Sequence, residues 1–189
     1  MGKLFEDKAE SLEDFKMFCG YVLADHCRYE RFLALCGDAE ATGAVFRVMA
    51  MAAGEDKTIE IDVIAFSCFG RMAFRNAWLA RYRGKLPRNS EHVEQFFRLV
   101  TGDFITAEAK MRPRISFRSR AKIVCFFQEP PTDADTSITR KMILVSFPVS
   151  LPEDFETPLH FHFEEEKDGI LRWMEEGLEM LAEKGGFGR

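Results

Sequence analysis

Basic side chains that alternate along one predicted strand are the residues with the clearest chemical role. The run 114–122 reads R-I-S-F-R-S-R-A-K, and its even positions include four cations: Arg114, Arg118, Arg120 and Lys122. Successive strand side chains point to opposite faces, so we expect these four to face outward together, with adjacent even positions about 7 Å apart. Like charges at that spacing repel each other unless an anion lies over them. The pattern therefore predicts a surface that binds phosphate groups.

The charge of the surrounding segment supports the same expectation. Residues 71–122 contain 13 Lys or Arg against four acidic residues, a local net charge of +9, although the whole chain has a net charge of −5. Three arginines are expected to flank the row, with a tyrosine available to stack on a base: Arg75, Arg81, Arg83 and Tyr82. Cations interleaved with an aromatic ring are typical of proteins that bind nucleic acid. A solvated sheet face, paired with glutamates on a neighbouring strand, would explain the row without a ligand.

A second group of residues has the spacing of metal ligands. His160, His162 and Glu164 form H-x-H-x-E, which places three donors on one face of a predicted strand. Imidazole and carboxylate donors suit zinc or iron. The motif has no obvious fourth ligand apart from His92 or His26, and two histidines on an apolar strand face are more often structural. We therefore expect no cofactor and keep a small metalloenzyme at this motif as the third functional hypothesis.

Motifs for nucleotide binding and for nucleophilic catalysis are not found in the sequence. It contains no Walker A loop and no dinucleotide fingerprint. The turn 67–70, S-C-F-G, follows a predicted strand but lacks the glycine that precedes a catalytic nucleophile. We therefore favour a binding protein over an enzyme.

Composition sets the class of protein. The chain has 189 residues, of which 47% are hydrophobic and 30% charged, the balance of a soluble globular domain. No apolar run approaches the roughly 18 residues that span a bilayer, and the N-terminus lacks the apolar stretch of a signal peptide. Five cysteines form an odd set without a C-x-x-C pair, which predicts buried free thiols in a reducing compartment. We expect a cytoplasmic protein.

Hydrophobic periodicity predicts helices in the first half and strands mainly in the second. Apolar residues at three- and four-residue steps predict helices over 12–36, 41–53, 71–83, 91–100 and 168–182. Alternating or β-branched runs predict strands over 58–67, 115–127, 138–147 and 159–165. We expect one α+β domain, residues 1–189, with a helical N-terminal half packed on an antiparallel sheet of about four strands and a C-terminal helix. Residues 1–54 would form its helical part and residues 55–189 its α+β part.

Acidic residues gather near the other end of the sequence. Three glutamates at 164–166 precede a predicted helix that carries Glu175, Glu176, Glu179 and Glu183. A solubilising face is the simpler interpretation. The alternative is a head-to-tail homo-oligomer in which this acidic end meets the basic segment of the next copy, an arrangement that gives a ring or a filament.

The last residues of the sequence carry a local resemblance. The stretch 177–189, G-L-E-M-L-A-E-K-G-G-F-G-R, resembles the helix and glycine loop of the RAMP proteins of CRISPR effector complexes. In that family a ferredoxin-like domain binds guide RNA, so the resemblance implies RNA rather than DNA as the partner. Whether the tail G-G-F-G-R is functional or frayed stays open.

Two hypotheses of function follow from the charge pattern. The leading one is a non-enzymatic binding protein that engages nucleic acid, with RNA favoured, through the basic face of residues 71–122. The alternative is a protein-binding module, such as an immunity protein, an adaptor or a self-assembling subunit, whose basic face docks an acidic partner. Arg and Lys serve both purposes, so the sequence does not separate them. Neither hypothesis involves a membrane.

Overall fold

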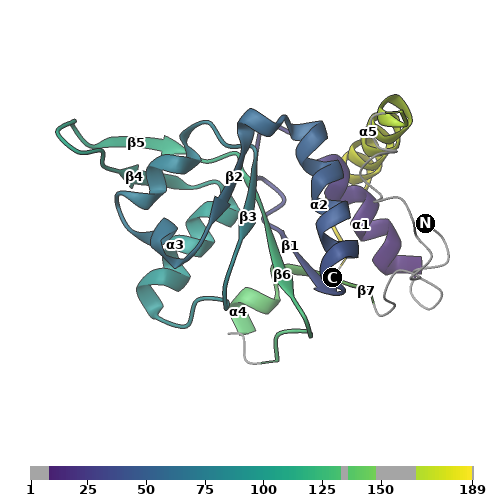
Figure 1. The fold of residues 1–189 in the computed structure, drawn as a ribbon, viewed down its shortest axis with the longest axis horizontal. Helices are drawn as coiled ribbons and strands as arrows, with labels where there is room; N and C mark the ends of the chain where they lie inside the picture. The colour runs from purple at the N-terminus through teal and green to yellow at the C-terminus, as the bar shows by residue number, and fades with distance from the viewer. Residues whose placement is uncertain (1–8, 133–135, 148–164, 189) are drawn as a thin grey trace.

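A five-stranded parallel sheet forms the centre of the protein. The computed structural model describes residues 9–132, 136–147 and 165–188. Neighbouring strands of the sheet are parallel, and their order is β2-β3-β6-β1-β7. The bounds of the strands are β1 Phe32–Gly37, β2 Thr58–Ile61, β3 Leu79–Tyr82, β6 Lys122–Phe127 and β7 Met142–Phe147. Helices cover the sheet on both sides, as Figure 1 shows.

One helical layer consists of α1 (Ala9–Tyr21), α2 (Ala39–Ala53) and α5 (Lys167–Lys184). Its core joins Phe18 of α1, Met49 of α2 and Met174 of α5, all fully buried, to strand residues such as Leu33 and Val145. α1 and α5 pack directly against each other on the outer side of this layer. Burial of these apolar side chains stabilises the layer on the sheet.

The opposite layer is built from shorter elements. It contains α3 (Ser90–Thr101), the short helix α4 (Thr136–Thr139) and two 3-10 segments, η3 (Val63–Phe66) and η4 (Gly70–Arg75). A further 3-10 turn, η2 (Glu55–Lys57), leads into β2. Phe66, Phe74 and Phe96 fill the space between these elements and the sheet, each 2% exposed or less. The large number of phenylalanines in the sequence is therefore used in two separate cores.

This architecture shows that the predicted fold class was wrong. The protein is an α/β fold with a parallel sheet, whereas the sequence predicted an antiparallel sheet under a helical N-terminal half. The predicted helix 12–36 is helical only as far as Tyr21, and its last part is the inner strand β1. The run F-L-A-L-C of β1 is buried on both faces, so it has no alternation to distinguish it from a buried helix.

Several other elements differ from their predicted form. The predicted helix 71–83 consists of η4 followed by the strand β3, and the predicted strand 58–67 ends at Ile61 and continues as η3. The helices α2, α3 and α5 lie where they were predicted. The predicted strand 138–147 contains β7, but its first two residues belong to the helix α4. The predicted strand 159–165, with His160, His162 and Glu164, lies outside the described residues apart from its last residue.

The predicted strand 115–127 is divided between two sheets. Its first part is β5 (Ile115–Arg118), which pairs in antiparallel fashion with β4 (Phe104–Ala107), and its second part is the central strand β6. The β4–β5 hairpin lies between β3 and β6 in the sequence and projects away from the central sheet (Figure 1).

The C-terminal tail is anchored on the body of the protein. The ring of Phe187 lies 5.9 Å from that of Tyr21, 6.1 Å from Tyr29 and 6.3 Å from Phe18, measured between ring centroids. Gly185 ends α5 in the left-handed conformation and turns the chain toward this aromatic cluster. Phe187 therefore has a structural role in the described part of the tail.

Candidate nucleic-acid interface

The β4–β5 hairpin is fixed to the body by polar contacts along β4 and just after it. Arg71 of η4 donates from Nε to the carbonyl oxygen of Thr106 at 2.7 Å and from Nη1 to that of Phe66 at 2.8 Å. The amide of Glu108 donates to the carbonyl oxygen of Cys68 at 3.0 Å. Ile105 and Ala107, which belong to β4, are almost fully buried. These contacts give the projecting strands a defined orientation.

The outer face of the hairpin carries an arginine stacked on an exposed aromatic ring. Phe104 lies opposite Arg118 in the strand register, and its side chain is 58% exposed. The guanidinium carbon of Arg118 lies 4.6 Å from the centroid of the Phe104 ring. Next to this pair, the hydroxyls of Thr106 and Ser116 lie 3.0 Å apart across the strands. A stacked guanidinium keeps its N–H edges free to contact phosphate oxygens.

A second arginine–aromatic pair lies where the hairpin joins the sheet. The guanidinium carbon of Arg120 lies 5.4 Å from the centroid of the Trp78 ring, and Nζ of Lys57 lies 5.1 Å from the same centroid. Trp78 directly precedes β3, and its carbonyl oxygen accepts a hydrogen bond from the amide of Lys122. Arg118 and Arg120 are thus both held over aromatic rings and both exposed.

Two further predicted cations lie near these pairs. Arg114 is 75% exposed and donates from Nε to the carboxylate of Glu108 within the hairpin. Arg75 is exposed at the end of η4, the segment that contacts β4. In β5 the even residues Ser116 and Arg118 are exposed while Ile115 and Phe117 are half-buried. The predicted alternation is therefore confirmed for this strand.

Lys122 does not belong to this surface, contrary to the sequence prediction. It is 1% exposed, donates from Nζ to the carbonyl oxygen of Ala24, and lies 4.9 Å from the centroid of the Tyr21 ring. Burial lowers the pKa of its ammonium to about 8. The amine is therefore out of reach of an external phosphate.

Three other residues that the sequence assigned to nucleic-acid binding make contacts elsewhere in the protein. Tyr82 is 1% exposed, and its hydroxyl donates to the carbonyl oxygen of Lys85 at 2.7 Å, so its ring is not available to a base. The guanidinium carbon of Arg81 lies 4.4 Å from the centroid of the Phe126 ring and 5.4 Å from that of Phe46, a residue of α2. Arg83 contacts Glu60 at 2.8 Å. Tyr82 is therefore out of reach of a base, and Arg81 and Arg83 contact other side chains than Arg118 and Arg120 do.

The sequence interpretation missed residues at both ends of the hairpin. Lys110, Met111 and Arg112 form its exposed tip, and Phe104 and Trp78 supply the rings at its root. The tip had a recognisable signal, because a short turn with a proline separates two alternating runs. Trp78 lies within the predicted helix 71–83, so its pairing with Arg120 was not foreseen.

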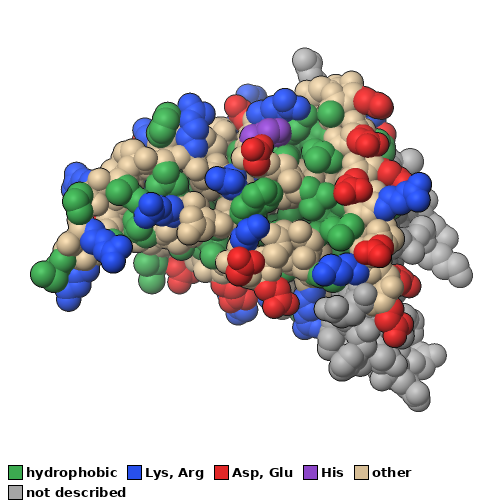
Figure 2. Space-filling model, turned by 90° about the horizontal axis from the view of Figure 1, so that it is seen from above, with side chains coloured by type: hydrophobic (Ala, Val, Ile, Leu, Met, Phe, Trp, Pro, Cys, Tyr) green, Lys and Arg blue, Asp and Glu red, His purple; other side chains and the backbone are tan. Residues whose placement is uncertain are grey.

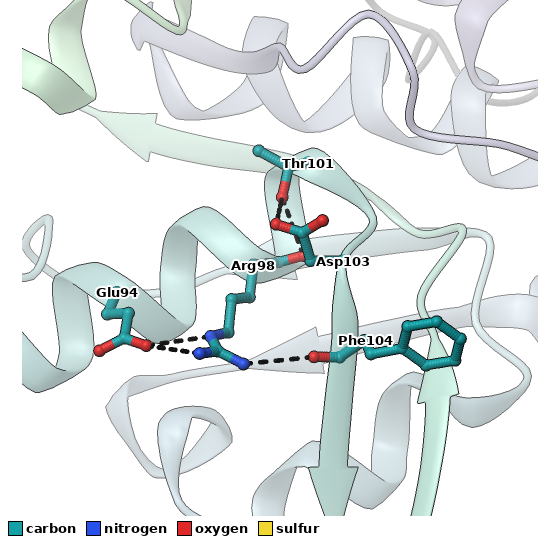
Figure 3. Close-up of polar contacts among 5 residues, drawn as sticks. All are labelled: Glu94, Arg98, Thr101, Asp103 and Phe104. Atoms are coloured by element: carbon teal, nitrogen blue, oxygen red, sulfur yellow. Dashed lines mark hydrogen bonds and ion pairs between the residues drawn. The ribbon is translucent and has the colours of Figure 1, made fainter.

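A groove lies beside the hairpin root, and its central arginine is used to hold the root in place. Arg98 of α3 donates from Nε and Nη2 to Glu94 Oε1 at 3.1 and 2.7 Å, and from Nη1 to the carbonyl oxygen of Phe104 at 3.5 Å (Figure 3). Thr101 also donates to Asp103 at 2.8 Å. The groove has a volume of about 800 Å³, and its lining residues are Arg88, Ser90, Val93, Glu94, Phe97, Arg98, Asp103 and Phe104.

The carboxyl end of β1, where parallel sheets commonly bind phosphate groups, holds a carboxylate. β1 and α2 are joined by Asp38 alone, and its Oδ1 accepts hydrogen bonds from the amides of Glu40 and Ala41 at 3.0 and 2.9 Å. These amides are the donors that a helix N-terminus would offer to a phosphate. An anion at this position would meet both satisfied donors and a like charge.

The remaining chemical candidates have structural roles where the structure describes them. Four cysteines are buried, Cys19, Cys27, Cys36 and Cys125, and Cys68 is half-buried; all five are free. His26 and His92 pack against aromatic rings. Within residues 9–132, 136–147 and 165–188, no group of three His, Cys, Asp or Glu side chains is arranged to hold a metal ion. No described helix is long and apolar enough to cross a membrane.

Comparisons with known proteins give a fold but no family. No protein-family model matches the chain, and no curated protein matches it. The A form apo structure of the NrS-1 C-terminal region is similar, with a TM-score of 0.70 and 13% identity over 91% of this chain and 43% of that one. A second apo structure of the same region gives a TM-score of 0.70 and 12% identity over 96% and 49% of the two chains.

A weaker likeness is to a JCV helicase structure, with a TM-score of 0.48 and 10% identity over 90% of this chain and 54% of that one. This likeness is too low to show a shared fold. The chain spans less than half the length of the NrS-1 regions that it matches. We conclude that this protein has the α/β fold found in part of the NrS-1 C-terminal region.

Proposed function

We propose that this protein binds single-stranded nucleic acid with the outer face of its β4–β5 hairpin and the adjoining end of the sheet. We call this region the hairpin surface. Its members are Arg75, Trp78, Phe104, Lys110, Arg112, Arg114, Arg118 and Arg120.

The observation that carries the proposal is the pair of stacked arginines, Arg118 on Phe104 and Arg120 on Trp78. Proteins that bind single strands combine cations that follow the phosphate backbone with aromatic faces on which bases stack. Arg118 and Arg120 are two residues apart, a step of about 7 Å in extended chain. That step is similar to the distance between successive phosphates of an extended strand.

The distribution of charge over the molecule supports the same partner. Residues 104–120 contain five Lys or Arg against one acidic residue, Glu108. Figure 2 shows Lys and Arg side chains gathered toward the hairpin end and Asp and Glu side chains toward the end where α5 lies. A polyanion would therefore be steered toward the hairpin and repelled from α5.

Binding of labelled 20-nucleotide RNA and DNA strands, measured by fluorescence anisotropy between 50 and 200 mM salt, tests the proposal. Replacing both stacked arginines, Arg118→Gln with Arg120→Gln, should weaken binding about tenfold or more and flatten its salt slope by about 1.4, because each phosphate contact to a single strand contributes about 0.7. RNA is the expected preference from the sequence, and a contact to the 2′-hydroxyl would make RNA bind more tightly than DNA.

The matched control removes two other arginines, Arg81→Gln with Arg83→Gln, and changes the net charge by the same amount. These side chains are placed beside Glu60, Phe126 and α2, so this variant should keep the affinity and salt slope of the wild type. Equal weakening by both double variants would show that net charge, and not the hairpin surface, determines binding. Absence of binding to either strand at 50 mM salt would contradict the proposal.

An acidic protein is the alternative partner, and it would contact η3 and η4 as well as the hairpin surface. Val63, Ile64 and Phe69 are 49%, 66% and 62% exposed on η3 and the turn after it, and exposed apolar residues beside arginines are typical of protein interfaces. In that case the purified protein would show a low 260/280 absorbance ratio, and a partner protein would copurify with it in stoichiometric amount. The Arg118→Gln, Arg120→Gln variant would no longer copurify with that partner protein.

A further inference from the structure

The tip of the hairpin is a tight turn with an unusual residue at its third position. The amide of Arg112 donates to the carbonyl oxygen of Ala109 at 3.0 Å, which closes a four-residue turn. Met111, the third residue, has a φ of +58°. Positive φ at this position favours glycine or asparagine, because a side chain there crowds its own backbone. Among the described residues, Glu30 is the other non-glycine residue with a positive φ.

The side chain at this strained position makes little use of the protein's own packing. Met111 is 97% exposed, more than any other large hydrophobic residue that the structure describes as exposed. Lys110 and Arg112 on either side of it are exposed too, and Arg114 is held within the hairpin by Glu108. Figure 2 shows hydrophobic side chains among basic ones at the hairpin end. The positive φ of Met111 costs stability, and its exposed side chain returns none through burial, which points to a role outside the fold.

We propose that Met111 is a wedge that inserts between adjacent bases of the bound strand and unstacks them. The inference rests on the proposed function, since it specifies what the hairpin surface does to the nucleic acid it holds. Methionine is among the apolar side chains that proteins insert between base steps. Lys110 and Arg112 would contact the phosphates on the two sides of the opened step. The hydrogen-bonded turn would keep the Met111 side chain directed toward the bases.

The arrangement fits a base stack better than a lipid surface. A membrane-binding segment buries a broad apolar face, whereas this tip presents one apolar side chain between two cations. The arginine–aromatic pairs at the hairpin root are suited to continue along a strand of nucleic acid.

Purine-rich single strands that contain 2-aminopurine at successive positions test the wedge, because stacking quenches the fluorescence of this base. Anisotropy and 2-aminopurine fluorescence are measured on the same samples, at protein concentrations that saturate the anisotropy. The wild type should raise the fluorescence about twofold or more at one or two adjacent positions. Met111→Gly, which suits the positive φ and keeps both cations, should lose this rise at saturation, and Met111→Leu should keep it.

The two measurements separate the outcomes. No change in anisotropy would mean that the proposed function itself fails. Saturable binding with equal 2-aminopurine signals for the wild type and Met111→Gly would overturn the wedge while the proposed function stands. The wedge would also be overturned if the wild type cosedimented with anionic phosphatidylserine vesicles, Met111→Gly did not, and the two proteins gave equal 2-aminopurine signals. That result would assign the tip to a membrane.

Discussion

A single buried ammonium makes the stability of this protein depend on pH. Burial lowers the pKa of Lys122 from its ordinary value of 10.5 to about 8. Between these two values the unfolded chain keeps the proton that the folded chain has lost, so the free energy of unfolding rises with pH. A difference of this size corresponds to about 3 kcal/mol of stability that is missing below pH 8 and present above pH 10.

Urea denaturation of the wild type and of Lys122→Met at pH values from 7 to 10.5 measures this contribution. The difference between the two proteins isolates Lys122 from the buried cysteines and tyrosines, which titrate in both. We expect Lys122→Met to be the more stable protein near pH 7 and to lose that advantage as the pH rises above 8. Parallel pH profiles for the two proteins would show that Lys122 has an ordinary pKa.

The residues that the sequence misplaced share one physical cause. Lys122 and Tyr82 lie on β6 and β3, inner strands of a sheet that is covered on both faces, so odd and even positions are equally buried. Alternation separates inner from outer residues only where one face meets solvent, as it does in β5. Arg114, Arg118 and Arg120, which lie outside the parallel sheet, were therefore predicted correctly as exposed.

At the scale of elements, the contact between α1 and α5 depends on two glycines. A Cβ atom on Gly20 would lie closer than 3.0 Å to backbone atoms of α5, and one on Gly177 would lie equally close to the carbonyl of Lys16. Ion pairs between Lys16 and Glu176 and between Lys184 and Glu13 border this contact. Because backbone cannot rotate away as a side chain can, the helices would have to move apart.

We expect Gly20→Ala to lower the free energy of unfolding by about 2–3 kcal/mol, the effect of overpacking a tight core. Gly169→Ala, on α5 with open space around the added methyl group, is the control and should be neutral or raise stability by about 0.5 kcal/mol. Chemical denaturation of the three proteins gives the comparison. A loss of similar size in both variants would contradict a specific close contact between α1 and α5.

Element types were predictable where the sequence had a clear period and a clear boundary. α3 and α5 have polar faces, and α2, α3 and α5 all end at glycines, so each was predicted within a few residues of its observed bounds. β1 and β3 are short buried strands that lack both signals, and both were predicted as parts of helices. Without these two strands, nothing in the sequence indicated a parallel sheet. The partners of a strand lie far away in the sequence, so local patterns carry no information on whether a sheet is parallel.

At the scale of the whole molecule, the separation of charge predicts head-to-tail contacts between copies. Glu175 and Glu179 are exposed on α5, at the end of the molecule away from the basic hairpin. Head-to-tail association would place these carboxylates on the hairpin surface of a second copy, and salt would weaken it because the charges are exposed. Nucleic acid would compete for the same arginines.

Light scattering after size exclusion at 50 and 500 mM salt measures this association. We expect the apparent mass to rise with protein concentration at 50 mM salt and to return to that of one chain at 500 mM. Glu175→Lys with Glu179→Lys should abolish the rise, and a 20-nucleotide strand should reverse it. A mass of one chain at every concentration and salt would exclude head-to-tail assembly.

The position of β1 also determines the order in which the protein can fold. β1 comes early in the sequence, yet its two neighbours in the sheet are β6 and β7, and these pairings join residues roughly a hundred positions apart, a separation that slows folding. During synthesis, the apolar strand F-L-A-L-C-G must wait until the second half of the chain has emerged. The newly made N-terminal part is therefore an aggregation-prone segment that a chaperone would be expected to bind before the sheet closes around it.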